Sequence, residues 1–165
     1  MGVDMRGGQP TTGNIKGGLT TIEEKSLGAI VKGGTRPIRD VYEYGDQITE
    51  KGLFVMDSPG REPEFLTGIA ATGVQLIIFS TGIGAPQGFP FVPVLKISGN
   101  PQTQRCLAGH IDKVIELPEK GTDSLAKAGQ DLFEEIKAIA SGKKTKAEVL
   151  GYGQFSNIFT VGPVI

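Results

Sequence analysis

The sequence predicts an α/β fold in which a mostly parallel sheet carries helices on both faces, giving three layers. Short apolar runs of strand length alternate with segments of helical periodicity. This order favours parallel strands, because each parallel connection needs a crossover. Glycine accounts for 25 of the 165 residues, about twice its usual share, and lies at the ends of the apolar runs, where turns are expected. A loop-rich domain is the alternative interpretation of the same glycine content.

The N-terminal quarter predicts an arm, a helix and an irregular stretch. Residues 1–19 combine glycines and polar residues with little periodicity, which predicts an extended Gly-rich arm and not a helix. A helix capped by Thr20 or Thr21 follows and ends at Gly33-Gly34. The stretch 37–49 is expected to be irregular. Three side chains are expected to anchor it: Ile38, Val41 and Tyr44.

The rest of the chain predicts four strands and three helices. The strands are expected at 53–56, 74–80, 92–97 and 114–117. The helices are expected from Pro63 to just before Gly73, from Asn100-Pro101 to about Ala108, and from Thr122 or Asp123 to Ser141-Gly142. The tail 151–165 is expected to form one more strand or a terminal arm. No linker divides the chain, so residues 1–165 are predicted to form a single domain.

Charge and composition exclude several classes of protein. The 17 basic and 18 acidic residues are balanced, which argues against a nucleic-acid or membrane-surface partner. No segment reaches the roughly 20 apolar residues of a membrane span, and the N-terminus lacks the apolar core of a signal peptide. A single cysteine fits a reducing compartment. These observations predict a cytoplasmic protein.

Polar residues follow three of the predicted strands, in the segments 57–60, 80–84 and 96–100. In a parallel sheet, all three segments are expected along the edge where ligands bind. The small residues there allow backbone N–H groups to approach an anionic oxygen closely. Lys96 can neutralise a carboxylate, or act as a base if burial lowers its pKa, and Asp57 can accept from a hydroxyl. The sequence therefore predicts a site for a small, polyhydroxylated anion.

Structural roles compete with these interpretations. Aspartate and serine at strand ends often cap the next helix, and Lys96 can simply be solvated. Cys106 lies in an apolar helical stretch and is expected to be a small core residue. His110 is expected at a helix C-terminus. One His and one Cys provide neither a zinc site nor a Ser-His-Asp set, and the glycine spacing at 82–88 argues against a nucleotide.

Several characteristic segments stand in order over nearly the whole chain: NIKGGLTTIEEKSLG at 14–28, MDSPG at 56–60, TG at 67–68, FSTGIGAPQG at 79–88, PVLKISGN at 93–100, ASG at 140–142 and Glu148. Together, these segments resemble the altronate/galactarate dehydratase family. Sulfolactate sulfo-lyase large subunits are similar to the same family. Family enzymes are much longer, so the chain resembles only their C-terminal part.

The resemblance implies the C-terminal domain of a hydro-lyase, inactive without its upstream portion. The reaction implied is dehydration of a sugar acid such as altronate or galactarate to a 2-keto-3-deoxy acid. The resemblance also implies a divalent metal, Fe(II), with ligands mostly outside this chain. The partners expected are the sugar acid, the rest of the full-length enzyme and, as a further option, other copies of the protein.

Site residues are assigned by residue type at the positions that carry the resemblance. Catalytic roles are expected of Lys16 and Lys96, through contact with a carboxylate or enediolate, and of Asp57, through contact with a hydroxyl. Substrate contacts are expected of Asn14, Thr20, Thr21, Lys25, Ser58, Ser80, Thr81, Gly82, Gly84 and Asn100. The alternatives are a non-catalytic domain that assembles or buttresses such an enzyme, and a fragment of a sulfolactate sulfo-lyase subunit.

Overall fold

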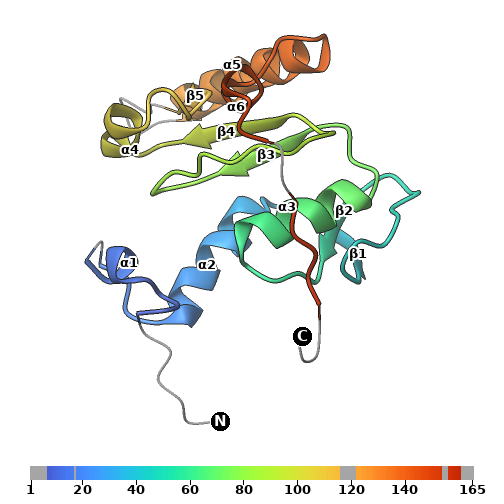
Figure 1. Cartoon of the computed structure of the whole chain (residues 1–165), viewed down its shortest axis with the longest axis horizontal. Coiled ribbons are helices and arrows are strands. Elements are labelled where there is room, and N and C mark those ends of the chain that lie inside the picture. Colours follow the sequence, from blue (N-terminus) through green and yellow to red (C-terminus); the bar gives the residue numbers. More distant parts are fainter. Residues whose placement is uncertain (1–6, 17, 116–121, 154–155, 161–165) are drawn as a thin grey trace. The chain divides into compact units, whose positions relative to one another are not determined.

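The computed structural model describes residues 7–16, 18–115, 122–153 and 156–160 (Figure 1). The chain forms two compact units, residues 1–39 and 40–165. Its described helices and parallel strands confirm the predicted α/β class. The three-layer arrangement and the single-domain organisation stay predictions.

The first unit contains two helices, α1 (Thr12–Lys16) and α2 (Ile22–Lys32). Helix α1 lies within the predicted extended arm, so the expectation of no helix there is wrong. Thr11 Oγ1 accepts from the Asn14 backbone N–H at 3.2 Å and donates to Asn14 Oδ1 at 3.0 Å, which closes the first turn locally. Helix α2 is confirmed, with the Thr21 side chain as its cap and Gly33 at its end.

A two-stranded sheet pairs β1 (Ile38–Tyr42), whose last three residues belong to the second unit, with β2 (Leu53–Met56). Strand β1 lies in the stretch predicted to be irregular. Its side chains Ile38 and Val41 are exposed, so they do not anchor the chain as expected. Tyr44 does, because its hydroxyl donates to the Glu64 carbonyl at 2.5 Å and its ring lies against Gly68.

Three parallel strands form the second sheet, in the order β3 (Ile77–Ser80), β4 (Val94–Ser98) and β5 (Lys113–Val114). Ile78 pairs with Leu95 across the first pair, and Ser98 pairs with Val114 across the second. The parallel sheet is therefore confirmed for these three strands. Strand β2 is not part of it, because it pairs with β1.

Helix α3 (Glu62–Ala71) packs against this sheet and begins, as predicted, around Pro63. Leu66 is completely buried and clusters with Ile77, Phe89 and Val94. Since side chains alternate along a strand, Val94, Lys96 and Ser98 share one face of β4. All three are buried. A lysine thus occupies the middle of a strand face that otherwise belongs to the core.

The remaining helices are α4 (Pro101–Cys106), α5 (Thr122–Ala140) and α6 (Lys146–Leu150). Helices α4 and α5 are as predicted, although the side chains of Thr122 and Asp123 lie outside the described residues. Helix α6 was not expected, and a capping box of Thr145 and Glu148 begins it.

The expectation for Cys106 is wrong, and those for His110, for the tail and for the strand at 114–117 are met only in part. Cys106 is exposed and not a core residue, because it ends α4 on the side turned to solvent. His110 lies in the turn after α4, where its N–H donates to the Leu107 carbonyl at 2.8 Å. The described tail residues 151–153 and 156–160 contain no strand. Of the strand expected at 114–117, residues 116 and 117 lie outside the described part of the chain.

Candidate functional site

The glycine loop, residues 80–88, follows β3 and is held by the start of α4. The Gly82 carbonyl accepts from Asn100 Nδ2 at 2.9 Å and from Thr103 Oγ1 at 2.5 Å. Thr81 Oγ1 accepts from the Gly84 N–H at 2.9 Å, which folds the loop back on itself. The structure therefore brings together four of the predicted site residues at the carboxyl ends of β3 and β4, where ligands bind in such sheets.

Gly84 packs the glycine loop onto α4. Its backbone dihedral φ is +106°, a value that residues with a Cβ rarely adopt. A Cβ there would lie 2.1 Å from Leu107 Cδ1 and 3.1 Å from Thr103 Cγ2. Gly82 differs, because a Cβ on it would meet nothing within 4 Å. The backbone at Gly84 thus comes closer to the helix than any other residue type allows.

Lys96 lies buried beside the glycine loop. Its side chain is completely inaccessible to solvent, which excludes the simple solvated lysine. Its ammonium Nζ donates to the Pro86 carbonyl at 2.9 Å, so it contacts the loop itself. An ammonium holding a carbonyl makes a stronger hydrogen bond than a neutral amine. In this arrangement Lys96 supports the loop from within the protein.

Three charged residues act on Lys96 from three different elements. Burial lowers the pKa of the Lys96 ammonium, the carboxylates of Asp112 and Glu62 raise it, and the Lys146 ammonium lowers it further. The Asp112 carboxylate accepts from the backbone N–H of Lys96 at 2.8 Å and from that of Lys146 at 2.6 Å. Lys146 Nζ donates to the carbonyls of Ala108 and Ile111, both at 2.6 Å.

Burial of Lys96 predicts that stability rises with pH in the alkaline range. Its pKa in the folded chain lies below the ordinary 10.5, so the unfolded chain holds this proton more tightly. The free energy of unfolding should therefore increase as pH rises from the folded pKa toward 10.5. Urea titrations across that range should show that the free energy of unfolding changes less with pH in Lys96→Met than in wild type. Lys143→Met, at a surface lysine, should keep the wild-type slope; equal slopes for wild type and Lys96→Met would contradict the prediction.

Asp57 and Ser58 do not join the glycine loop at a shared sheet edge. They follow β2, which belongs to the other sheet, so the expectation of three strand ends along one edge is wrong for this segment. Asp57 is exposed, and its N–H donates to the Tyr42 carbonyl at 2.8 Å. Ser58 Oγ donates to the Pro59 carbonyl at 3.2 Å. The carboxylate that acts on Lys96 from α3 is Glu62 instead.

Five predicted site residues lie in the first unit, and their contribution to the site stays a prediction. Thr21 and Asn14 form the helix-starting hydrogen bonds described above. Thr20 donates through its N–H to Glu24 Oε2 at 2.8 Å. Lys25 Nζ donates to Gln9 Oε1, and Lys16 is the last residue of α1.

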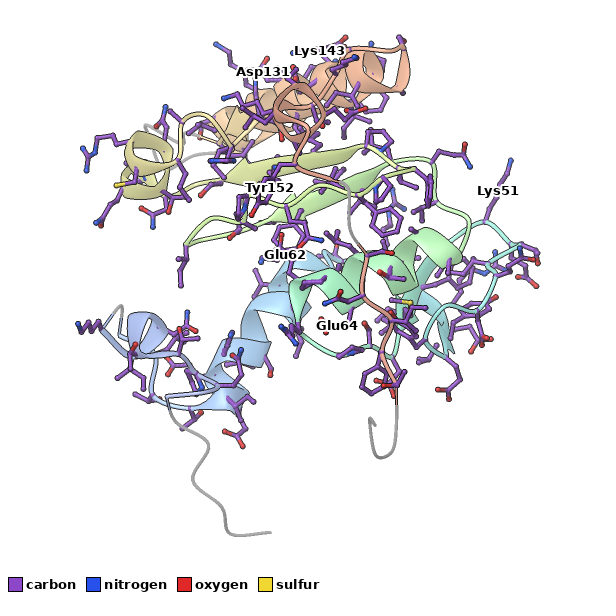
Figure 2. All side chains as sticks on the ribbon, viewed as in Figure 1. Lys51, Glu62, Glu64, Asp131, Lys143 and Tyr152 are labelled. Atoms are coloured by element: carbon purple, nitrogen blue, oxygen red, sulfur yellow. The ribbon has the colours of Figure 1, made fainter. Side chains whose placement is uncertain are left out.

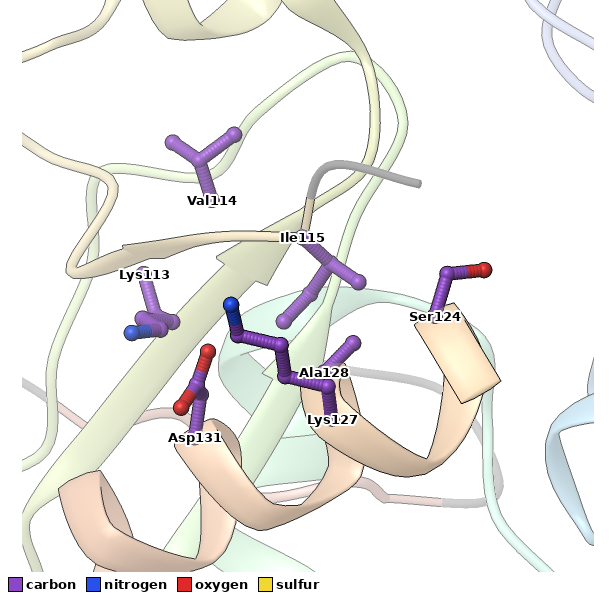
Figure 3. Close-up of a pocket in the computed structure, with 7 residues that line it drawn as sticks. All are labelled: Lys113, Val114, Ile115, Ser124, Lys127, Ala128 and Asp131. Atoms are coloured by element: carbon purple, nitrogen blue, oxygen red, sulfur yellow. The ribbon is translucent and has the colours of Figure 1, made fainter. Parts of the chain in front are cut away.

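Two open pockets lie between α5 and the strands. One, of about 510 Å³, is lined at the strand ends by Ser80, Ser98 and Gly99, and its α5 wall includes the small residues Ala128 and Gly129. The other, of about 540 Å³, lies along β5 and carries charges of both signs, including Lys127 and Asp131 (Figure 3). The first contains a predicted substrate-binding residue, Ser80, so it is the better candidate for ligand contact.

The described residues do not provide a metal centre. No three His, Cys, Asp or Glu side chains among them lie close enough to hold an ion. The buried side-chain atoms found without a hydrogen-bond partner are Glu62 Oε1, Glu64 Oε2 and His110 Nδ1. In the same part of the chain, no helix is long and apolar enough to cross a membrane.

Sequence reasoning missed the two carboxylates of this arrangement, Glu62 and Asp112, as it missed Lys146. Glu62 precedes Pro63 at a helix start, where an acidic residue is ordinary. Asp112 precedes a two-residue strand and carries no periodic signal. Both residues act on the Lys96 ammonium, and only the folded chain shows that they lie near it.

Comparison with known proteins identifies the family. Residues 1–163 match the family model described as D-galactarate/Altronate dehydratase, C-terminal. The chain is 41% identical over 153 residues to the (2R)-sulfolactate sulfo-lyase subunit beta of Chromohalobacter salexigens, covering 92% of this chain and 39% of that subunit. It is 32% identical over 165 residues to the galactarate dehydratase (L-threo-forming) of Escherichia coli, covering 99% of this chain and 32% of that enzyme.

A third relative gives the same result. The altronate dehydratase of Bacillus subtilis is 39% identical over 103 residues, which are 62% of this chain and 20% of that enzyme. The chain thus spans less than half the length of these curated relatives. The segments of the glycine loop and of Lys96 lie inside the matched region. The chain therefore belongs to the family of D-galactarate/altronate dehydratase C-terminal domains.

Proposed function

We propose that this chain is the C-terminal domain of a hydro-lyase that dehydrates a sugar acid such as altronate or galactarate to a 2-keto-3-deoxy acid. The family match over residues 1–163 carries the proposal. The glycine loop and the buried Lys96 support it, because the loop backbone is open at Gly82 and the Lys96 ammonium brings a positive charge to the same loop. Such a combination favours a bound carboxylate or the enediolate formed from it.

The proposed dehydration removes a proton and a hydroxyl from neighbouring carbons of the sugar acid. A base removes the proton on the carbon next to the carboxylate, and the hydroxyl on the following carbon leaves as water after gaining a proton. The resulting enol becomes the 2-keto-3-deoxy acid. In this chain, we assign the glycine loop to the substrate and Lys96 to holding the loop and adding positive charge beneath it. Asp57, Lys16 and the first-unit residues remain proposed participants.

The metal also remains a proposal. A divalent ion, proposed as Fe(II), would act as a Lewis acid on a leaving oxygen when bound. The described residues gather no set of ligands for it, so its ligands would come mostly from outside this chain. The proposed partners are the rest of the full-length enzyme and the sugar acid, in a cytoplasmic assembly.

Activity of the assembled enzyme tests the proposal. The chain joined to its upstream portion and supplied with a ferrous salt is expected to form a keto acid from altronate or galactarate. The same assembly with the Gly82→Asp substitution, which places a negative charge in the loop, is the matched inactive control. Absence of keto acid from both sugar acids, in an assembly that is folded and loaded with metal, would contradict the proposed reaction.

A sulfo-lyase function is the second candidate. The observation that favours it is the 41% identity over 92% of this chain to a (2R)-sulfolactate sulfo-lyase subunit. The same assembly should then consume (2R)-sulfolactate and leave the sugar acids unchanged. A purely assembling role is the remaining alternative. It would be supported by tight self-association of the chain, seen by light scattering, with no calorimetric response to galactarate and no effect of loop mutations.

A further inference from the structure

Two buried polar atoms of opposite charge, Lys96 Nζ and Glu62 Oε1, are not hydrogen-bonded to each other in the described structure. The Lys96 ammonium has three N–H donors, and the described residues show one of them in use, toward the Pro86 carbonyl. The Glu62 Oε1 atom is buried and has no hydrogen-bond partner among them. Burying a charged group without compensation is costly, so such a pair requires a physical reason.

The packing of α3 on β4 places these two groups on facing surfaces. Leu66 of α3 and Val94 of β4 lie in the same buried cluster. Glu62 lies four residues before Leu66, one turn along the same helix face. Lys96 lies two residues after Val94, on the same strand face. Figure 2 shows Glu62 at the start of α3, on the side facing the sheet.

The other charged groups around Lys96 already have partners. Both oxygens of Asp112 accept backbone N–H groups, from Lys96 and Lys146. The Lys146 ammonium is held by two carbonyl groups. Glu62 is therefore the carboxylate near Lys96 whose Oε1 is not engaged in the described structure. The interaction is mutual, since Lys96 lowers the pKa of Glu62 against the larger rise caused by burial.

We infer that Glu62 is a positioning residue, whose buried carboxylate attracts the Lys96 ammonium across the packing of α3 on β4 and so favours its hydrogen bond to the Pro86 carbonyl of the glycine loop. The structural part of this inference stands on the packing of α3 against β4 and on the buried Glu62 Oε1 that has no hydrogen-bond partner among the described residues. Its consequence for catalysis rests on the proposed function. Glu62 is not assigned any contact with substrate.

A pair of glutamine variants of this chain tests the inference. Glu62→Gln removes the charge and keeps the shape. Glu64→Gln makes the same change two residues further along α3, where Glu64 Oε1 pairs with the exposed Arg61 at 3.2 Å. The pH titration of the Lys96 side chain is followed by NMR with labelled lysine. Hydrogen exchange then measures the stability of the loop amides of residues 81–85, 87 and 88.

Glu62→Gln is expected to lower the pKa of Lys96. Exchange of the loop amides should become about fivefold faster, the change that weakening one hydrogen bond produces. Glu64→Gln should leave both quantities unchanged. In wild type, the Lys96 signals should also show an inflection where Glu62 titrates, which requires no variant to fold. Absence of that inflection, or equal effects of both variants, would overturn the inference.

The assembled enzyme separates this inference from the proposed function. If the enzyme dehydrates sugar acids, Glu62→Gln should shift the alkaline limb of the kcat–pH profile to lower pH, and Glu62→Asp should restore it. An enzyme without dehydratase activity but with the NMR and exchange effects would contradict the proposed function and leave the inference standing. An active dehydratase in which the Lys96 signals show no inflection from Glu62 would contradict the inference and leave the proposed function standing.

Discussion

Replacement of Gly84 by alanine is expected to lower the free energy of unfolding by about 2–5 kcal/mol. Two costs add. An L-residue at positive φ costs roughly 1–2 kcal/mol, and forcing an extra carbon into a packed contact costs about 1–3 kcal/mol. Both apply here, because φ is +106° and the new Cβ would lie 2.1 Å from Leu107 Cδ1. Urea denaturation of the 165-residue chain measures the change directly.

Gly82→Ala is the matched control for this prediction. It lies in the same loop, and a Cβ there meets nothing within 4 Å. We expect its effect on stability to stay within about 1 kcal/mol. Leu107→Ala in the Gly84→Ala background should recover part of the loss, because it removes the atom that the new Cβ meets. Equal stability of the two single variants would show that the loop does not pack on α4 as described.

Removal of the Lys96 charge is expected to reduce turnover of the assembled enzyme by about 100-fold or more. This is the usual magnitude when one electrostatic donor is removed from an active site. Lys96→Met keeps most of the side-chain volume but loses the hydrogen bond to Pro86. Lys96→Ala also leaves a cavity, which should lower the free energy of unfolding by about 2–5 kcal/mol. Turnover is measured at saturating sugar acid, alongside a denaturation curve for each variant.

Lys143→Met controls for loss of a lysine without loss of the buried contact. Lys143 pairs with Glu135 at 2.6 Å on the surface of the protein, and such pairs contribute little (Figure 2). Its turnover should equal that of wild type. Wild-type turnover in a folded Lys96→Met enzyme would remove Lys96 from the catalytic arrangement and leave it a structural lysine.

The elements that local patterns specify were predicted well from the sequence. Helix α2 is confirmed between a threonine cap and Gly33, since capping and glycine termination involve only neighbouring residues. Strands β3 and β4 follow from apolar runs that end in small residues. Helices α1 and α6 were missed because each has five residues, too short for a periodic signal.

The sequence predicted which residues form the glycine loop and its neighbours, but not which strands pair and so which residues lie together. The residues Thr81, Gly82, Gly84 and Asn100 do lie together, as the carboxyl ends of neighbouring parallel strands must. Asp57 does not, because strand pairing placed β2 in another sheet. Pairing joins residues far apart in the chain, and no local pattern states which strands meet.

By itself, the sequence determined the α/β class, the family and the loop that begins at Ser80, because each depends on residue types in a fixed order along the chain. Only the tertiary structure decided the surroundings of Lys96. Its burial, its bond to Pro86 and its proximity to Glu62 and Asp112 arise from packing between α3, β4 and the start of β5. Burial weakens the solvation of the Lys96 ammonium, so each neighbouring charge has a larger effect on its pKa than it would have at the surface.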